Sequence, residues 1–188
     1  MGRWEPNARG RLGQAAMELY AERGFDQTTV AEIAERAGLT ARTFFRHYAD
    51  KRDVLFGGTA PLTAAVTGAV AAAPAGARPF AVVGLAVEAA AELIQQAPEQ
   101  VVLRQAIIDA HPELRERELV KLADLATALA VALTDRGLDP WPARLAAEAG
   151  LAAFRVAFAR WIADSAAGPL TLAVRNSFED LTATVTPA

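Results

Sequence analysis

The sequence contains no cysteine and only two histidines, His47 and His111, among its 188 residues. Without cysteine the chain can form no disulfide, no thiolate zinc site and no cysteine nucleophile, a composition suited to a reducing cytoplasm. It also contains no phosphate-binding glycine loop and no G-x-S-x-G nucleophile motif. The grouped carboxylates Glu113, Glu116 and Glu118 lie at a polar helix start that we interpret as solvated surface. We therefore expect no enzyme activity, no metal site and no cofactor.

Long apolar runs are also missing. Residues 1–6 lack the apolar core of a secretory signal. The most apolar stretch, residues 80–94, is interrupted by Glu88 and Glu92 and is too short to span a bilayer. We therefore expect a soluble, cytoplasmic protein with no membrane partner.

A basic excess, the simplest sign of a nucleic-acid-binding protein, is absent, because the net charge is −3. The charge is unevenly distributed, however. Residues 1–56 carry nine Lys/Arg and eight Asp/Glu, whereas residues 57–188 carry ten and 14, which gives +1 and −4. Binding to DNA needs a local basic face rather than a basic protein, and only the first segment could supply one.

What the sequence does contain is helical periodicity throughout. Alanine, the best helix former, dominates the 53% of hydrophobic residues, and no run alternates with the period of a strand. The pattern predicts an all-α protein with a domain boundary at Gly57-Gly58, giving domains at 1–56 and 57–188. In the second domain, with prolines near the helix starts, the expected helices are 60–73, 79–96, 98–109, 112–136, 142–164 and 170–185.

The first domain carries the pattern of a helix-turn-helix. An apolar stripe at helical spacing precedes Gly24 and consists of Leu12, Ala15, Ala16, Leu19 and Tyr20. Thr29 and Glu32 have the spacing of a capping box, which begins a second helix that ends at Gly38. Thr40 can cap a third helix, 41–48, and Asp50 a fourth that starts at Lys51. Two short helices joined by a tight glycine turn are typical of DNA-binding motifs.

The third helix has two different faces. Phe44 and Tyr48, four residues apart, are expected to point into a three-helix core, which leaves hydroxyl and guanidinium groups outside. Arg42 could bond a guanine edge, and Thr40 and Thr43 could serve bases or phosphates.

The sequence from Gly24 to Lys51 also resembles the DNA-binding segment of TetR-family transcriptional regulators. The matching motifs are Gly24-Phe25, Thr29-Val30, Ile33-Ala34, Ala37-Gly38-Leu39-Thr40, Thr43-Phe44-Phe45, His47-Tyr48 and Lys51. The resemblance, together with the outward face of the third helix, implies DNA contacts from Thr29, Thr40, Ala41, Arg42, Thr43, Phe45, Arg46, His47 and Lys51. The chain departs from the family at Phe45, where tyrosine is usual, and at Arg42, where glycine is frequent.

In this family the second domain dimerises and binds a small effector. The motifs 111–117, 128–137, 143–145 and 154–161 resemble the subgroup with an acyl-CoA-like ligand-binding domain, which includes mycofactocin-type regulators. The effector-binding candidates are Arg104, Ile107, Phe154, Arg155 and Phe158. Arg104 and Arg155 interrupt apolar helices, so each could anchor an anionic effector, pair with a glutamate such as Glu148 or Glu88, or reach out to solvent.

The last two helices carry apolar stripes that the resemblance assigns to a homodimer interface, with candidates Trp161, Ile162, Val174, Phe178 and Leu181. The expected function is a ligand-responsive transcriptional regulator, in the first place a repressor. It would bind double-stranded DNA at a palindromic operator as a dimer, and a small, largely apolar, acyl-type effector would release it. An activator remains an alternative. A carrier of apolar ligands would not need Arg42 or the capped third helix.

Overall fold

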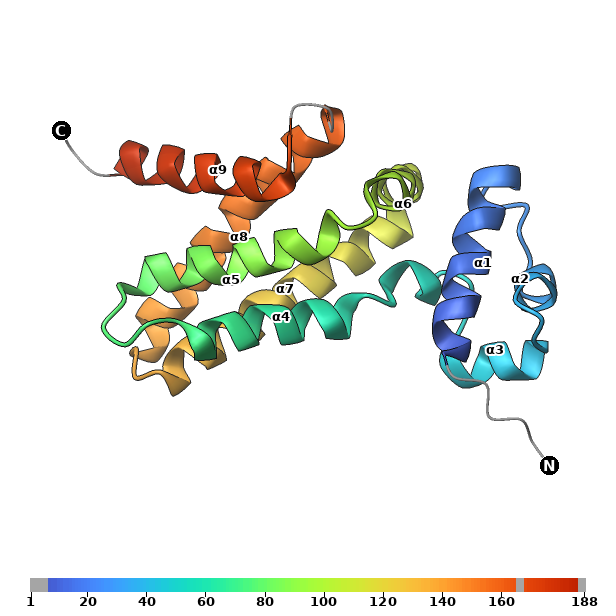
Figure 1. Ribbon diagram of the computed structural model, residues 1–188, viewed down its shortest axis with the longest axis horizontal. Coiled ribbons are helices and arrows are strands. Elements are labelled where there is room, and N and C mark those ends of the chain that lie inside the picture. The colour runs from blue at the N-terminus through green and yellow to red at the C-terminus, as the bar shows by residue number, and fades with distance from the viewer. Residues whose placement is uncertain (1–6, 165–167, 186–188) are drawn as a thin grey trace. The chain divides into compact units, whose positions relative to one another are not determined.

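The computed structural model describes residues 7–164 and 168–185, and within these ranges every regular element is a helix. The elements are α1 (Ala8–Arg23), α2 (Val30–Arg36), α3 (Ala41–His47), the 3₁₀ turn η1 (Asp53–Phe56), α4 (Thr59–Ala72), α5 (Pro79–Ile94), α6 (Pro98–Ala110), α7 (Pro112–Asp135), α8 (Pro140–Ala163) and α9 (Leu170–Val185) (Figure 1). The all-α prediction is confirmed, and the helices of the second half start and end within two residues of the expected positions.

The chain forms two compact units. The headpiece unit contains the residues up to Gly58 together with Leu103–Leu114, and the helical unit contains the rest. The sequence pattern predicts a single domain over 57–188, whereas the structure groups segment 103–114 with the headpiece unit. The cause is a set of apolar side chains, Ile107, Ile108 and Leu114, which are buried in the same core as α1 and η1.

The headpiece core forms from the stripe expected on α1. Leu12, Phe44 and Ile33, one from each of the three helices, have no exposed surface. Gly24 ends α1 with a φ of +85°, a conformation that residues with a side chain rarely adopt. The capping box is confirmed: the Thr29 hydroxyl accepts from the Glu32 amide at 3.3 Å, and Glu32 accepts from the Thr29 amide at 2.9 Å.

The fourth helix expected from Lys51 is instead the single turn η1. The Asp50 carboxylate does accept a hydrogen bond from the Asp53 amide, at 2.9 Å, but the turn ends at Phe56. Gly57 and Gly58 follow directly, and glycine is a poor helix former, so the chain restarts as α4 at Thr59.

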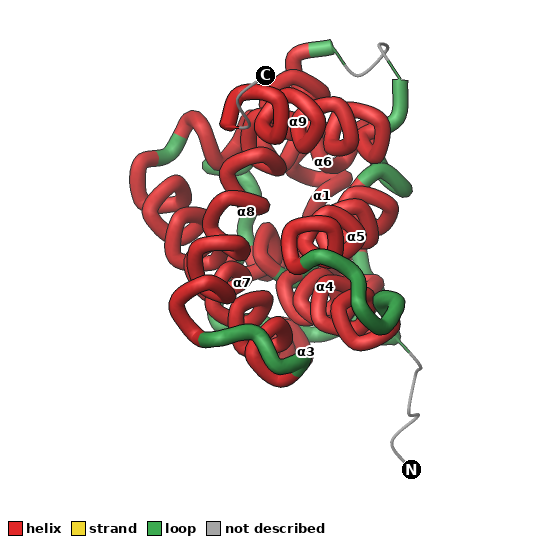
Figure 2. Tube along the Cα trace, turned by 90° about the vertical axis from the view of Figure 1, so that its left-hand side faces the viewer, coloured by secondary structure: helices red, strands yellow, loops and turns green. Residues whose placement is uncertain are grey.

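The helical unit is built around α5, which packs on α4, α8 and α9. Figure 2 views these helices nearly end-on. The fully buried residues include Val70, Val83, Leu129, Ala147 and Val174. At Gly150 the backbone of α8 lies so near Val83 that a Cβ atom there would clash with Cγ1 of Val83. This small residue allows the close approach of α5 and α8.

Two segments satisfy a length and hydropathy test for membrane helices: residues 53–72, and α5 with α6 if they are counted as one bent span. Leu62, Val66 and Val70 form a buried stripe on α4 in the core of the helical unit. Side chains from one face of this segment thus serve protein packing.

Candidate nucleic-acid interface

The N-terminus of α3 is organised by two threonines. The Thr40 hydroxyl accepts from the Thr43 amide at 3.2 Å, and the two hydroxyl oxygens lie 3.1 Å apart. Phe44 and Tyr48 point inward, with 0% and 5% of their surface exposed, and this confirms the expected core face. Thr40 and Ala41 are exposed and Thr43 is half-buried, so the capped end of the helix can be reached from solvent.

The arginines of the headpiece unit divide into paired and unpaired groups. Arg36 holds Glu22 at 2.7 Å, Arg23 holds Glu32 at 2.8 Å, and Arg11 donates to the Ala37 carbonyl. The hydrogen bond from Arg36 lowers the pKa of Glu22 below its ordinary value. Arg23 and Arg36 are thus neutralised by carboxylates, and Arg11 is engaged by a backbone carbonyl.

Arg42 and Arg46 differ from these paired arginines. Both are exposed, and neither pairs with any residue within 7–164 or 168–185. They lie four residues apart, so they project from the same side of α3. Two like charges at this spacing repel one another slightly in the free protein. The arrangement therefore concentrates unbalanced positive charge on the outward face of a short helix.

Phe45 lies on the same face. Its side chain is 59% exposed, and its ring meets the buried Phe44 ring edge-on, with centroids 5.6 Å apart. This face therefore combines a large exposed apolar ring with two guanidinium groups that pair with no described residue. Arg42, Phe45 and Arg46 are thus brought together as expected.

Lys51 binds the loop between α1 and α2 and does not belong to the outward face of α3. Its ammonium group donates to the carbonyl oxygens of Phe25, Asp26 and Thr28, at 2.8, 3.1 and 3.0 Å, and it lies 4.6 Å from the centre of the Phe25 ring. An ammonium group has three protons, and these carbonyls use all of them. A phosphate contact, expected from the sequence, would require the group to release one of these bonds.

Thr29 and His47, two further candidates for DNA contact, are less accessible than the residues on the outward face of α3. Thr29 donates its hydroxyl to Glu32 at 2.8 Å while accepting from its amide, so this hydroxyl serves the cap of α2. His47 is half-buried, and its Nε2 atom has no hydrogen-bond partner among the described residues.

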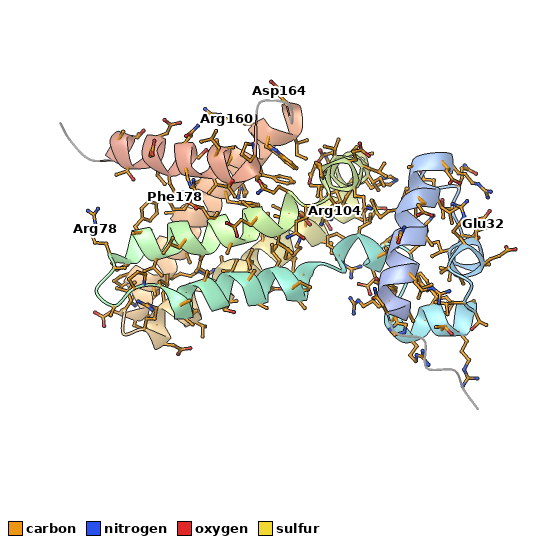
Figure 3. The ribbon with its side chains drawn as sticks, in the orientation of Figure 1. Glu32, Arg78, Arg104, Arg160, Asp164 and Phe178 are labelled. Carbon is orange, nitrogen blue, oxygen red and sulfur yellow. The ribbon has the colours of Figure 1, made fainter. Side chains whose placement is uncertain are left out.

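The effector candidates are divided between the two units, with Arg104 and Ile107 in the headpiece unit and the others in the helical unit. Arg104, labelled in Figure 3, donates from Nε to the Leu55 carbonyl at 2.6 Å and lies 5.3 Å from the Phe56 ring centre. Ile107 is buried in the headpiece core. Glu148 and Glu88, the glutamates named as one alternative for pairing with Arg104 or Arg155, form ion pairs with Arg144 and Arg175.

The remaining effector candidates belong to α8. The rings of Phe154 and Phe158 stack with centroids 5.7 Å apart and pack in the core of the helical unit, whereas Arg155 is exposed. The exposure of Arg155 agrees with the alternative in which its charge reaches solvent.

Most of the candidates for the dimer interface pack within the chain's own helical unit. Trp161 and Val174 are 5% and 0% exposed, and Phe178 packs on Phe80 between α9 and α5 (Figure 3). Ile162 and Leu181 are half-buried. The outward apolar residues of α8 and α9 are instead Val156 and Leu172, 52% and 46% exposed.

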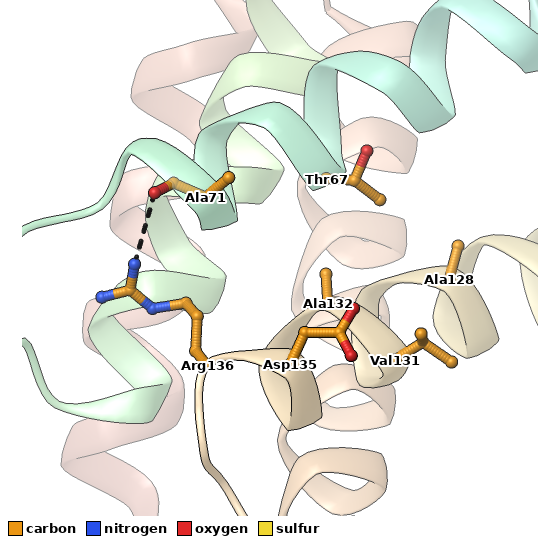
Figure 4. Close-up of a pocket in the computed structure, with 7 residues that line it drawn as sticks. All are labelled: Thr67, Ala71, Ala128, Val131, Ala132, Asp135 and Arg136. Carbon is orange, nitrogen blue, oxygen red and sulfur yellow. Dashed lines mark hydrogen bonds between the residues drawn. The ribbon is translucent and has the colours of Figure 1, made fainter.

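An open groove between α4 and α7 was not anticipated from the sequence. It has a volume of about 510 Å³ and is lined by Thr67, Ala71, Ala128, Val131, Ala132, Asp135 and Arg136 (Figure 4). Arg136 is held at its end by the carbonyls of Val70, Ala73 and Pro74, at 2.9 to 3.1 Å, where it balances the C-terminal dipole of α4. Alanine-rich helix surfaces give no sequence signal for such a groove.

A capped helix-turn-helix with a basic outward face is typical of DNA-binding domains. Residues 13–56 match the N-terminal domain of bacterial regulatory proteins of the TetR family. The transcriptional regulator TcmR of Streptomyces glaucescens is 38% identical over 72 residues, which are 38% of this chain and 32% of TcmR. The match thus spans about a third of that relative. The first unit of the chain thus carries a DNA-binding domain similar to that of TetR-family regulators.

Solved structures extend the likeness of the fold to nearly the whole chain. The fatty acid degradation regulator FadR of Bacillus halodurans has a TM-score of 0.67 and 18% identity, with 95% of each chain covered. FadR of Thermus thermophilus, a TetR-family repressor solved with lauroyl-CoA, has a TM-score of 0.62 and 23% identity, with 96% of each chain covered. At these identities the likeness establishes the fold.

Proposed function

We propose that the chain is a TetR-family regulator and acts as a ligand-responsive repressor. It binds a palindromic operator as a homodimer, and a small, largely apolar, acyl-type effector releases it. The observation that carries the DNA-binding part is the outward face of α3, on which Arg42 and Arg46 lack partners among the described residues and Phe45 is exposed. A site that contacts phosphates and base edges needs this combination of free charge and accessible side chains.

In this proposal the residues that approach DNA are Thr29, Thr40, Ala41, Arg42, Thr43, Phe45, Arg46 and His47. Arg42 and Arg46 supply charge, and the Thr40–Thr43 hydroxyl pair can donate or accept, because either hydroxyl can be the donor in the contact between them. Lys51 is reassigned: it positions the loop between α1 and α2 through the carbonyls of Phe25, Asp26 and Thr28.

The homodimer is proposed through α8 and α9. Val156 and Leu172 leave apolar surface on these helices without cover from the described residues. A two-fold dimer would place two copies of α3 about 34–36 Å apart, in successive major grooves, and would require a palindromic site.

The acyl-type effector is supported by the fold and by the composition of the helical unit. FadR of Thermus thermophilus was solved with lauroyl-CoA. The core of the helical unit here is almost wholly Ala, Val, Leu and Phe, as a chamber for an apolar chain would be. Arg104 and Ile107 belong to the headpiece unit, so Phe154 and Phe158 become the leading candidates for contact with the effector.

The test begins with selection of bound fragments from random DNA by the purified protein. A recovered palindrome and a mass corresponding to a dimer support the proposal, whereas no enrichment overturns it. The operator complex is then titrated with acyl-CoA esters of increasing chain length. Because coupling is reciprocal, the operator must weaken acyl-CoA binding by the same factor by which acyl-CoA weakens operator binding. Equal affinities with and without operator would overturn the effector part alone.

A further inference from the structure

The outward face of α3 carries an apolar column beside its basic column. Ala41 and Phe45 are four residues apart, as are Arg42 and Arg46, so the two pairs run side by side along the helix. Ala41 is exposed, and Phe45 is 59% exposed. Exposed Leu, Val and Trp residues occur in the helical unit, but Phe45 is the large hydrophobic side chain of the headpiece unit that is most open to solvent among the described residues.

The Phe45 ring has a defined position. It meets Phe44 at an interplanar angle of 85° with centroids 5.6 Å apart, and Phe44 is fully buried and therefore held by the core. The ring is thus preorganised before DNA binds, which reduces the entropic cost of binding.

The chemistry of the ring limits what it can contact. Phe45 has no hydroxyl, so it cannot donate a hydrogen bond to a phosphate or to a base acceptor. In the major groove the base edges present hydrogen-bonding groups, with one apolar exception, the C5-methyl group of thymine. An exposed, fixed apolar ring on a helix that enters this groove matches that methyl group.

We propose that Phe45 reads the C5-methyl group of one thymine in each operator half-site, next to the base pair that Arg42 contacts. This inference rests on the proposed function, because it requires α3 to lie in the major groove. It makes Phe45 a specificity-determining residue. It also predicts that 5-methylcytosine, which carries the same methyl group, can replace this thymine when the paired adenine is replaced by guanine.

The experiment uses the operator recovered by selection and replaces its thymines one at a time by uracil, which removes only the methyl group. For the wild-type protein we expect one thymine in each half-site at which replacement raises the Kd about fourfold, as the loss of one buried methyl group implies. The other replacements should leave the Kd unchanged within about a factor of two.

Phe45→Ala is the matching protein variant, and its exposed position predicts normal folding, which thermal unfolding checks. It should bind the thymine and uracil operators equally, because the methyl group no longer has a partner. Arg42→Ala is the control: its affinity falls, but the thymine-to-uracil ratio persists. An unchanged ratio in Phe45→Ala, or the absence of any methyl-sensitive thymine, would overturn this inference while the proposed function stands. If selection recovers no DNA, the proposed function fails, and this inference fails with it.

Discussion

His111, directly after α6, lies 3.2 Å from the Asp26 carboxylate in the loop between α1 and α2, measured from Nε2 to Oδ1. Its other ring nitrogen, Nδ1, lies 2.7 Å from the Ile107 carbonyl, and the ring meets Phe25 edge-on with centroids 5.1 Å apart. One imidazole thus joins segment 103–114 to the first loop of the headpiece unit, a link across 85 residues of sequence.

The first prediction concerns the pH dependence of this link. The hydrogen bond to the Ile107 carbonyl, and then Asp26, raise the pKa of His111 above its ordinary value. A histidine whose pKa is higher when folded stabilises the protein fully below its unfolded pKa, about 6.5. That contribution is lost as the pH rises through the folded pKa. Urea unfolding should therefore show that His111→Gln costs less stability at pH 8.5 than at pH 6. Equal costs at the two pH values would contradict it.

Lys51 provides the second prediction. Lys51→Met keeps an apolar stem near Phe25 but removes the ammonium donor shared by three carbonyls, two of which have no other donor shown among the described residues, so we expect a loss of about 1–3 kcal/mol in unfolding free energy. The salt dependence of DNA affinity should hardly change, because the ammonium group does not meet a phosphate in this geometry.

Arg52→Met is the matched control for Lys51→Met. Arg52 is the next residue, is exposed, and pairs with nothing in the described ranges, so its loss should leave stability within about 0.5 kcal/mol. If Lys51→Met instead kept full stability and flattened the salt dependence, the positioning role would be wrong.

Lys51 and Arg104 also show which part of the site could not be predicted from the sequence. The apolar stripe of α1, the capping box at Thr29 and the two faces of α3 follow from local spacing, and all three appear in the structure. Lys51 and Arg104 bind backbone carbonyls 23 to 49 residues away. A carbonyl is present at every residue, so the sequence carries no mark of which one a cation will reach.

Segment 103–114 was misplaced for a related reason. The spacing of Ile107 and Ile108 indicates that one side of α6 is buried, and both are buried. Periodicity does not show which of two cores receives that side. The same applies to Trp161 and Val174, whose stripe suits a dimer interface and a single-chain core equally, and which pack in the core.

A third prediction tests the close approach of α5 and α8. Gly150→Ala would place a methyl group against Cγ1 of Val83, which is fully buried and cannot move away freely. We expect a loss of about 1–3 kcal/mol in unfolding free energy, as for other overpacked cores. Gly68→Ala, in the middle of α4 with nothing within 4 Å of its Cβ position, is the control and should gain about 0.5–1 kcal/mol. Chemical denaturation of both variants measures these changes. A Gly150→Ala protein as stable as the wild type would contradict the close packing.

The last prediction concerns Arg42, the second position at which the chain departs from the TetR-family pattern that it resembles. Arg42 is exposed and pairs with no described residue, so Arg42→Ala removes no internal contact and should leave the thermal stability unchanged. It also relieves the repulsion with Arg46. If Arg42 bonds a guanine edge, operator binding weakens by about 1–3 kcal/mol and the preference for that base pair disappears in a second selection. Arg46→Ala separates this role from plain charge, because a phosphate contact lowers the affinity for all sequences alike. An Arg42→Ala protein with unchanged affinity and unchanged base preference would remove this residue from the interface.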